Sequence, residues 1–340
     1  MTGAGFTRRS EAAWAALTSC LARAPGRQVV VKDGPRRGAS LAALWPFGQV
    51  LAAAAAAVPL GLVDLDTTVA PLLHAMERYR SAHGYGPFPG DHTRYYDDNA
   101  WIALDLLQLA AVTGDERYET AAAELFEFLE EGEAGDGGVR WMEGQTSRHT
   151  CSTGPAAQVA LRLFLSSGER RYLDFGLRQM RFLDERLRDD AGLYRDNVGG
   201  DDEVEPTIWS YNQGTPIGAA ALLARVGAGD DWLEHAIRVA RAADAHFAAD
   251  DGWWRQPPVF NAIHFRNVLA LLAQVPDDDL LLTIDRYLDR VWTEARQPET
   301  GLFVDGGIGS YDGRPTIDQA GLAQLFAFRI WPPEHWRDIC

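Results

Sequence analysis

The apolar and polar residues of this chain alternate with the period of an α-helix. Apolar residues recur three or four positions apart, as in Trp101, Leu104 and Leu107, and alternation with the period of a β-strand is nearly absent. Glycine, proline, aspartate and asparagine mark the breaks between periodic segments. The pattern predicts an all-α protein with helices at residues 10–24, 41–57, 67–82, 98–113, 116–131, 152–166, 170–187, 214–226, 230–248, 260–274, 278–295 and 317–329.

Short glycine-containing turns join the helices in pairs. In the turns Thr113–Tyr118, Ser167–Tyr172 and Gly227–Trp232, a glycine ends one helix, an acidic residue opens the next and an aromatic residue follows. Longer, aromatic-rich loops separate the pairs and recur at intervals of roughly fifty to sixty residues. This repeat predicts six helical hairpins in a single domain that spans residues 1–340.

Repeated hairpins bury their apolar stripes against one another, either in an open solenoid or in a closed ring. The irregular loops and the single circuit of hairpins favour the ring, which is an (α/α)6 toroid. In such a ring the long loops gather on one face, where a rigid helical scaffold usually places its functional residues. We therefore expect one cleft with contributions from all the long loops.

Composition narrows the possible partners and cofactors. The formal net charge of -16, from 48 acidic and 32 basic residues, would repel phosphate backbones and argues against a nucleic-acid partner. The cysteines Cys20, Cys151 and Cys340 are scattered singly, without the spacing of a disulfide framework or a zinc site. We expect reduced thiols, no metal and no cofactor, because phosphate-binding loops and zinc-protease motifs are also absent from the sequence.

Targeting segments are not evident in the sequence. The basic pair Arg8-Arg9 is followed by Glu11 within a stretch of amphipathic helical spacing, which does not fit a signal peptide. The apolar run from Leu51 to Leu62 is interrupted by Pro59 and is too short for a transmembrane segment. The expected location is cytoplasmic, with non-classical export as the other route.

Two adjacent carboxylates, Asp97 and Asp98, stand at the mouth of a strongly apolar predicted helix. Helix N-termini favour carboxylates, so capping alone explains one of the two residues. A retaining glycosidase needs two carboxyl groups about 5 Å apart, and their mutual repulsion raises one pKa so that a proton remains available. Since aromatic residues flank the pair, we predict a catalytic role for both.

Aromatic and amide side chains near the other loop ends are candidates for sugar binding. Rings pack on the apolar faces of sugars and amides pair with hydroxyl groups, although each of these residues also fits helix capping or core packing. The candidate substrate-binding residues are Trp45, Tyr96, Asn99, Trp101, His149, Trp209, Tyr211, Asn212, Gln213, Asn261 and Asp312.

From about Trp45 to Leu325 the chain resembles glycoside hydrolase family 76, the α-1,6-mannanases. The resemblance is carried by Tyr96–Trp101 and Trp209–Gly214, and by weaker blocks at Ser152–Ala157, Gly192–Asp196 and Ile317–Ala320. It implies an (α/α)6 barrel and a cofactor-independent retaining hydrolase, with Asp97 as nucleophile and Asp98 as acid/base. The implied activity is endo-cleavage of an α-1,6-linked mannan.

The composition suggests a source for the substrate, and the fold type is compatible with other functions. The high content of alanine, arginine and aspartate is typical of a GC-rich bacterial genome, which makes the mannan of a bacterial envelope lipoglycan a candidate substrate. Two alternatives stay open: a toroid enzyme of the sugar-epimerase or unsaturated-glucuronyl-hydrolase type, and a glycan-binding protein without turnover.

Overall fold

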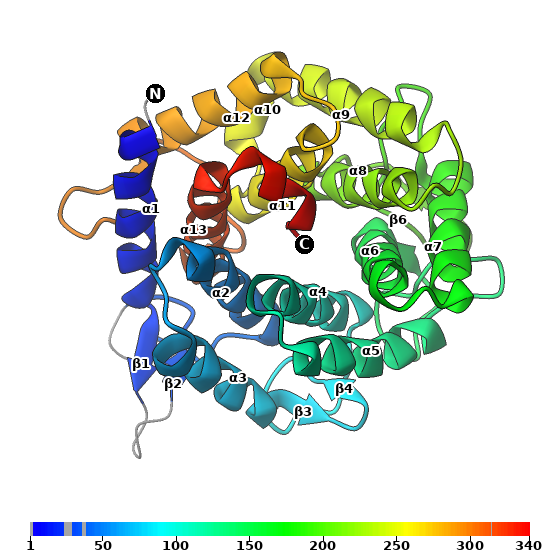
Figure 1. Ribbon diagram of the computed structural model, residues 1–340, viewed down its shortest axis with the longest axis horizontal. Coiled ribbons are helices and arrows are strands. Elements are labelled where there is room, and N and C mark those ends of the chain that lie inside the picture. The colour runs from blue at the N-terminus through cyan, green and yellow to red at the C-terminus, as the bar shows by residue number, and fades with distance from the viewer. Residues whose placement is uncertain (1–2, 24–28, 36–38, 314) are drawn as a thin grey trace.

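The computed structural model describes residues 3–23, 29–35, 39–313 and 315–340, and its helices form two concentric rings. Each inner helix contacts the next, and the last contacts the first, so that the inner ring is closed (Figure 1). The prediction of an all-α (α/α)6 toroid is confirmed. The inner helices are α2 (Leu44–Ala57), α4 (Tyr96–Thr113), α6 (Thr150–Ser167), α8 (Ser210–Arg225), α11 (Pro258–Leu272) and α13 (Pro315–Ile330).

The outer ring covers the inner one, and one of its helices comes from the opposite end of the chain. The first helix, α1, packs on the last inner helix, α13, so the two ends of the chain together complete the ring (Figure 1). Arg9 of α1 also pairs with Asp289 of α12 at 2.6 Å. The outer helices are α1 (Gly3–Thr18), α3 (Ala70–Met76), α5 (Glu116–Glu131), α7 (Arg170–Phe182), α9 (Trp232–Ala248) and α12 (Asp278–Arg290).

Short elements connect the two rings. The short helices are η1 (Val58–Leu60), η2 (Leu65–Val69), η3 (Glu77–Tyr79), η4 (Leu183–Leu187), η5 (Ala249–Asp251), α10 (Gly252–Arg255), η6 (Val291–Ala295) and η7 (Pro333–Asp338). Antiparallel pairing joins β1 (Leu21–Arg23) with β2 (Val29–Val31), β3 (Arg80–Ser81) with β4 (Gly84–Tyr85), and β5 (Arg148–His149) with β6 (Asn197–Val198), which also pairs with β7 (Val204–Glu205). The periodicity did not predict these strands, since they are too short to show an alternating pattern.

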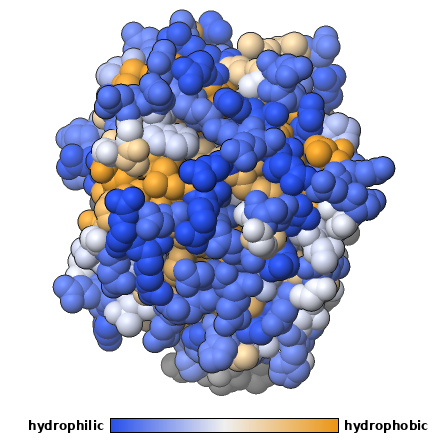
Figure 2. All heavy atoms as spheres, turned by 90° about the vertical axis from the view of Figure 1, so that its right-hand side faces the viewer, coloured by the Kyte–Doolittle hydropathy of each residue, from blue (hydrophilic) through white to orange (hydrophobic). Residues whose placement is uncertain are grey.

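Residue type explains which helices lie inside. The inner helices have protein on every side, and their residues, such as the alanine run Ala52–Ala57, are buried almost throughout. The outer helices are amphipathic, with one apolar face against the inner ring and charged residues outside. Figure 2 accordingly shows a mostly hydrophilic face with separate apolar patches. Among the described residues, no helix is long and apolar enough to cross a membrane.

Glycines allow neighbouring inner helices to approach closely. A Cβ atom on Gly214 of α8 would lie 2.5 Å from the Cα of His264 in α11, and one on Gly154 of α6 would lie 2.3 Å from the hydroxyl oxygen of Thr215. Both distances are too short for any side chain. The first contact is with backbone, so a larger residue at Gly214 would force the two helices apart.

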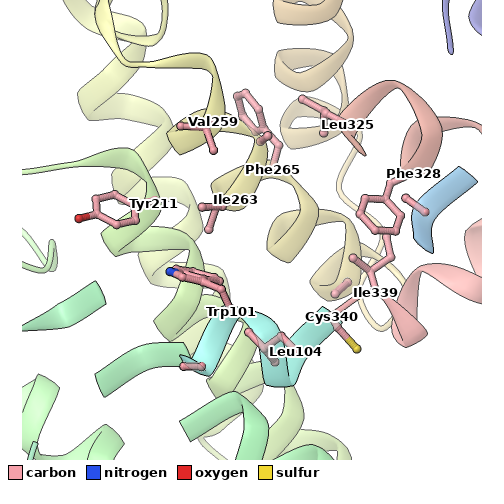
Figure 3. Packing of buried hydrophobic residues seen from close by; sticks show 14 of the residues in the cluster. Trp101, Leu104, Tyr211, Val259, Ile263, Phe265, Leu325, Phe328, Ile339 and Cys340 are labelled. Atoms are coloured by element: carbon pink, nitrogen blue, oxygen red, sulfur yellow. The ribbon is translucent and has the colours of Figure 1, made fainter. Parts of the chain in front are cut away.

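The centre of the ring is filled rather than hollow. Side chains of α4, α11 and α13, including Trp101 and Phe328, pack there (Figure 3). Arg266 lies among them, 5.5 Å from the centre of the Trp101 ring, and donates to Gln324 Oε1 at 2.9 Å. At the C-terminal ends of the inner helices, Gln108 accepts a hydrogen bond from the backbone of Cys340 at 2.8 Å. One end of the ring is thereby closed by protein.

The predicted helix limits differ from the observed ones mainly at the inner N-termini. Helices α4, α6, α8, α11 and α13 begin about two to four residues before the predicted positions, because the residues that precede them are not capping types. Tyr95, His149 and Trp209 occupy N-cap positions without a side-chain capping bond. At the chain start, α1 begins at Gly3 and residues 21–23, predicted as helix, form β1.

Candidate active site

A cavity of about 530 Å³ lies at the N-terminal ends of the inner helices. The second or third residue of each inner helix lines its wall. Parallel helices in a ring direct equivalent positions toward the axis of the ring, so the same position of each helix faces the cavity. These residues are Trp45 of α2, Asp97 of α4, Cys151 of α6, Tyr211 of α8, Phe260 of α11 and Ile317 of α13. Loop residues complete the wall: Ala43, Pro87, Tyr95, Trp141, His149, Asp196, Trp209, Tyr311 and Asp312. The helical residues Pro46, Asp98 and Trp101 also line it.

Asp97 is held by hydrogen bonds on both carboxylate oxygens. Its Oδ1 accepts the backbone N–H of Asp98 at 2.9 Å, and its Oδ2 accepts the indole N–H of Trp141 at 3.0 Å. The thiol of Cys151 donates to the same Oδ2 at 3.6 Å. Within the described ranges no comparable donor reaches the carboxylate of Asp98, so the two neighbours sit in different environments.

This difference separates the protonation states of the pair. Burial raises the pKa of Asp97 to about 6, while the hydrogen bonds from Asp98, Trp141 and Cys151 limit the rise. Burial, followed by the negative charge of Asp97, raises the pKa of Asp98 well above its ordinary value. Two close carboxyl groups titrate as a pair that holds one proton over a wide pH range. At neutral pH the geometry therefore assigns the charge to Asp97 and the proton to Asp98.

A second polar group lies beside the pair. The ring of His149 stacks on Trp141 with centroids 5.3 Å apart, and its Nε2 is 3.1 Å from Ser147 Oγ. Burial lowers the pKa of His149, although Asp196 opposes the shift. The imidazole is thus neutral at physiological pH, where one ring nitrogen donates a hydrogen bond and the other accepts one.

Asp196 is a third carboxylate in the cavity wall. It accepts the side-chain amide N–H groups of Asn212 at 2.9 Å and of Asn197 at 3.0 Å. These two bonds fix its orientation. Asn212, predicted to bind substrate, is fully buried and instead supports Asp196.

Aromatic rings form the wall beside the carboxylates. Tyr211 stacks on Phe260 at 4.1 Å between centroids, and the edge of Trp209 meets Phe260 at 5.5 Å. Trp45 meets Tyr311 edge-on at 4.7 Å. Such a wall offers flat apolar surface of the kind that the C–H faces of sugars pack against.

The structure places the predicted site residues in two groups. The cavity is lined by Asp97 and Asp98, and by Trp45, Trp101, His149, Trp209, Tyr211 and Asp312. The other candidates, Tyr96, Asn99, Asn212, Gln213 and Asn261, do not line it. Tyr96 faces the outer ring, where it stacks on Phe128 at 4.6 Å.

The buried amides serve the scaffold instead. Asn99 accepts the backbone N–H of Tyr85 and donates to its carbonyl, and Gln213 makes the same two bonds with Tyr194. Asn261 donates to the backbone carbonyl of Trp253. These amides hold the chain segments that precede the inner helices, and so fix the loops that carry the site.

The roles of Trp141, Asp196 and Tyr311 were not predicted from the sequence. Each lies in a loop between hairpins, and no periodic signal indicates which loop residue turns toward the axis. Trp141 reaches Asp97 from 44 positions away in the sequence, through the loop before β5. Asp196 was noted only as the last residue of the Gly192–Asp196 block, which is one of the weaker parts of the family resemblance. Among the described residues, no group of three or more histidine, cysteine, aspartate or glutamate side chains could hold a metal ion.

Comparison with known proteins finds relatives in sequence and in structure. An alignment of 122 positions to a mannan endo-1,6-alpha-mannosidase of Candida glabrata is 29% identical; it covers 33% of this chain and only 27% of that protein's length. A family 76 mannosidase of Bacteroides thetaiotaomicron superposes with a TM-score of 0.80 at 22% identity, over 95% of this chain and 97% of that one.

An inactive variant of an α-1,6-mannanase from Salegentibacter sp. superposes with a TM-score of 0.78 at 20% identity, over 96% of this chain and 99% of that one. At these identities the structural likeness establishes the fold. The model of glycosyl hydrolase family 76 matches residues 30–293, which is most of the sequence. This chain belongs to glycosyl hydrolase family 76.

Proposed function

We propose that the protein hydrolyses α-1,6-mannosidic linkages with retention of anomeric configuration, and that it cleaves within the mannan chain. The observation that carries the proposal is the adjacent pair Asp97 and Asp98 in the cavity wall, where hydrogen bonds favour the charge on Asp97 and burial beside that charge raises the pKa of Asp98. A double displacement requires this division of roles between two carboxyl groups.

In the first step Asp97 acts as the nucleophile. A carboxylate oxygen of Asp97 bonds to the anomeric carbon as the glycosidic C–O bond breaks, and Asp98 gives its proton to the departing oxygen. The product is a mannosyl ester of Asp97 together with the released sugar chain. The hydrogen bonds from Trp141 and Cys151 hold Asp97 in place for the attack.

In the second step Asp98 acts as a base. Its carboxylate takes a proton from water, the water oxygen bonds to the anomeric carbon, and the ester bond to Asp97 breaks. Asp97 is released as a carboxylate and Asp98 is protonated again, which restores the starting state. The two inversions give net retention.

The related proteins support the choice of substrate. The Candida glabrata relative is a mannan endo-1,6-alpha-mannosidase, and the Salegentibacter variant is in complex with α-1,6-mannotriose. That variant is described as inactive and carries asparagine at two consecutive aspartate positions. An adjacent aspartate pair is also what this cavity holds.

The cavity suits an oligosaccharide. Its volume of about 530 Å³ lies within the usual range of roughly 300–1,000 Å³ for small-molecule sites. Aromatic rings on one side and carboxylates on the other match the apolar faces and the hydroxyl groups of sugars. The sugar-epimerase and glucuronyl-hydrolase alternatives would use acidic or histidine residues from separate loops. The cavity holds such residues in His149, Asp196 and Asp312, so the choice of substrate separates these alternatives from hydrolysis by the consecutive acids of α4.

Incubation of the purified protein with linear α-1,6-mannan, other α-mannans and bacterial lipomannan tests the proposal. We expect a ladder of oligosaccharides from the α-1,6-linked chains, and proton NMR of the first products should show the α-anomer. The variants Asp97→Asn and Asp98→Asn should release almost nothing. Full activity in both variants, or β-anomers as first products, would contradict the mechanism, and binding without release would favour a glycan-binding role.

A further inference from the structure

The thiol of Cys151 lies in the cavity wall next to the proposed nucleophile. Cys151 is the second residue of α6 and is 5% exposed, and its Sγ is 3.6 Å from Asp97 Oδ2. The hydroxyl of Tyr211, at the equivalent position of α8, faces the same sulfur and lowers the pKa of the thiol. Asp97, Cys151 and Tyr211 are thus neighbours on three adjacent inner helices.

We propose that Cys151 is a positioning residue for Asp97: its thiol passes a hydrogen bond from the Tyr211 hydroxyl to the carboxylate and holds it, with Trp141, in the orientation for attack. This inference deepens the proposed function and rests on it for the catalytic role of Asp97. The hydrogen-bond chain itself is a property of the free protein and can be measured without substrate.

The surroundings make such a donor important. In the described part of the chain, no lysine or arginine lines the cavity, so Asp97 has no cation as a partner there. The charged and titratable groups that face Cys151 and Asp97 are acidic, neutral or phenolic. They are Tyr95 before α4, Asp98 in α4, His149 before α6, Asp196 before α8, Tyr211 in α8, and Tyr311 and Asp312 before α13. Hydrogen bonds must therefore do much of the work of stabilising the charge on Asp97.

The protonation state of the Cys151 thiol is that of a hydrogen-bond donor. Burial, and then the negative charges of Asp97 and Asp196, raise the pKa of Cys151 well above its ordinary value. The sulfur consequently keeps its proton throughout the working pH range and does not compete with Asp97 as a second anion. A thiol is a weak hydrogen-bond donor. Because a C–S bond is longer than a C–O bond, the sulfur of Cys151 in α6 reaches farther toward Asp97 of α4 than a serine hydroxyl at this position would.

The test is an NMR titration of the Asp97 side-chain carboxyl carbon in wild-type protein, Cys151→Ala and Cys20→Ala. Cys20 is a matched control, because it is also a buried thiol but lies near Thr316 and Ser19 rather than the catalytic pair. Loss of a weak donor to a charged group should raise the pKa of Asp97 by about half a unit in Cys151→Ala. The control should titrate as wild type.

Tyr211→Phe should shift the Asp97 titration in the same direction by a smaller amount. If Cys151→Ala remains folded by thermal melting and Asp97 titrates as in wild type, Cys151 has only a packing role and the inference fails. If the titration shifts but no glycan is cleaved by wild type, the hydrogen-bond chain stands and the proposed function fails.

Activity gives a second readout where wild type cleaves mannan. A pKa increase of half a unit from about 6 lowers kcat/KM by roughly two-fold at pH 6 and hardly at all at pH 8 through ionisation alone. A loss that is equal at all pH values and appears only in KM would contradict the positioning role.

Discussion

Replacing Trp141 by phenylalanine tests how the charge on the proposed nucleophile is stabilised. The indole N–H donates to Asp97 Oδ2 at 3.0 Å, and the ring stacks on His149. Phenylalanine keeps most of the aromatic contact and removes the donor. The change therefore isolates one hydrogen bond.

The expected magnitude follows from the kind of bond that is lost. A hydrogen bond to a charged group contributes about 1.5–3 kcal/mol, which corresponds to a change of about one to two pKa units. Removal of a donor to the carboxylate destabilises its charged form, so the pKa of Asp97 must rise, from about 6 to roughly 7–8. At pH 6 the charged fraction then falls from about a half to below about a tenth.

The assay is the pH dependence of kcat/KM on α-1,6-mannan oligosaccharides. The acid limb, which reports ionisation of Asp97 in the free enzyme, should move to higher pH by about one to two units, and activity should recover toward pH 8–9. Trp336→Phe is the control: its indole also donates a buried hydrogen bond, to the carbonyl of Phe328 at 3.0 Å, but lies at the other end of the ring. An acid limb that stays in place in Trp141→Phe, or shifts equally in Trp336→Phe, would refute the reasoning.

Other substitutions address the acid, the scaffold and the ring. Asp98→Asn should lower kcat on mannan by about 10²–10⁴-fold, and much less for an aryl mannoside whose leaving group needs no proton; equal losses on both substrates would argue against an acid role. Gln213→Ala should cost about 1–3 kcal/mol of stability in denaturant unfolding, because the backbone groups of Tyr194 lose their partner. An unchanged unfolding midpoint with a raised KM would instead show that Gln213 binds substrate. Gly214→Ala should destabilise the protein by about 1–3 kcal/mol, since α8 and α11 cannot separate freely; a wild-type melting temperature would contradict that contact.

Helical periodicity and the repeated turns between hairpins together predicted the ring, because they indicate the apolar faces of the helices and the number of hairpins. The same periodicity could have distinguished residues that line the cavity from residues that support the scaffold, once one residue that faces the axis of the ring was known. Consecutive residues of a helix are about 100° apart, so Asn99 lies about 200° from Asp97 and faces away from the axis, while Trp101 lies about one turn on and faces it. Tyr211 and Gln213 repeat this relation in α8. The amides were assigned by residue type alone, without this geometric step.

The partners of the catalytic pair could not be predicted in the same way. Trp141 and Tyr311 lie in irregular loops, and their directions depend on β-bridges and turns that form only after the hairpins pack. An isolated bridge joins Tyr95 to Met142, next to Trp141, and so brings this loop against the start of α4. The contact of Cys151 with Asp97 could not be predicted either, because it forms only when α4 and α6 lie side by side.

The direction of the inner helices explains why the catalytic pair lies at this face of the ring. The cavity wall holds the carboxylates of Asp97, Asp98, Asp196 and Asp312, with no lysine or arginine among its described residues. Each helix N-terminus contributes about half a positive charge, and the N-cap residues of α2, α4, α6, α8 and α11 make no side-chain capping bond. The helix dipoles therefore provide a positive potential at this face, and the N–H of Asp98 donates directly to Asp97, which partly offsets the burial of that carboxylate. At the opposite face the same ring presents carbonyl groups, which would destabilise a buried carboxylate, so only the N-terminal face can hold an ionised nucleophile beside a protonated acid.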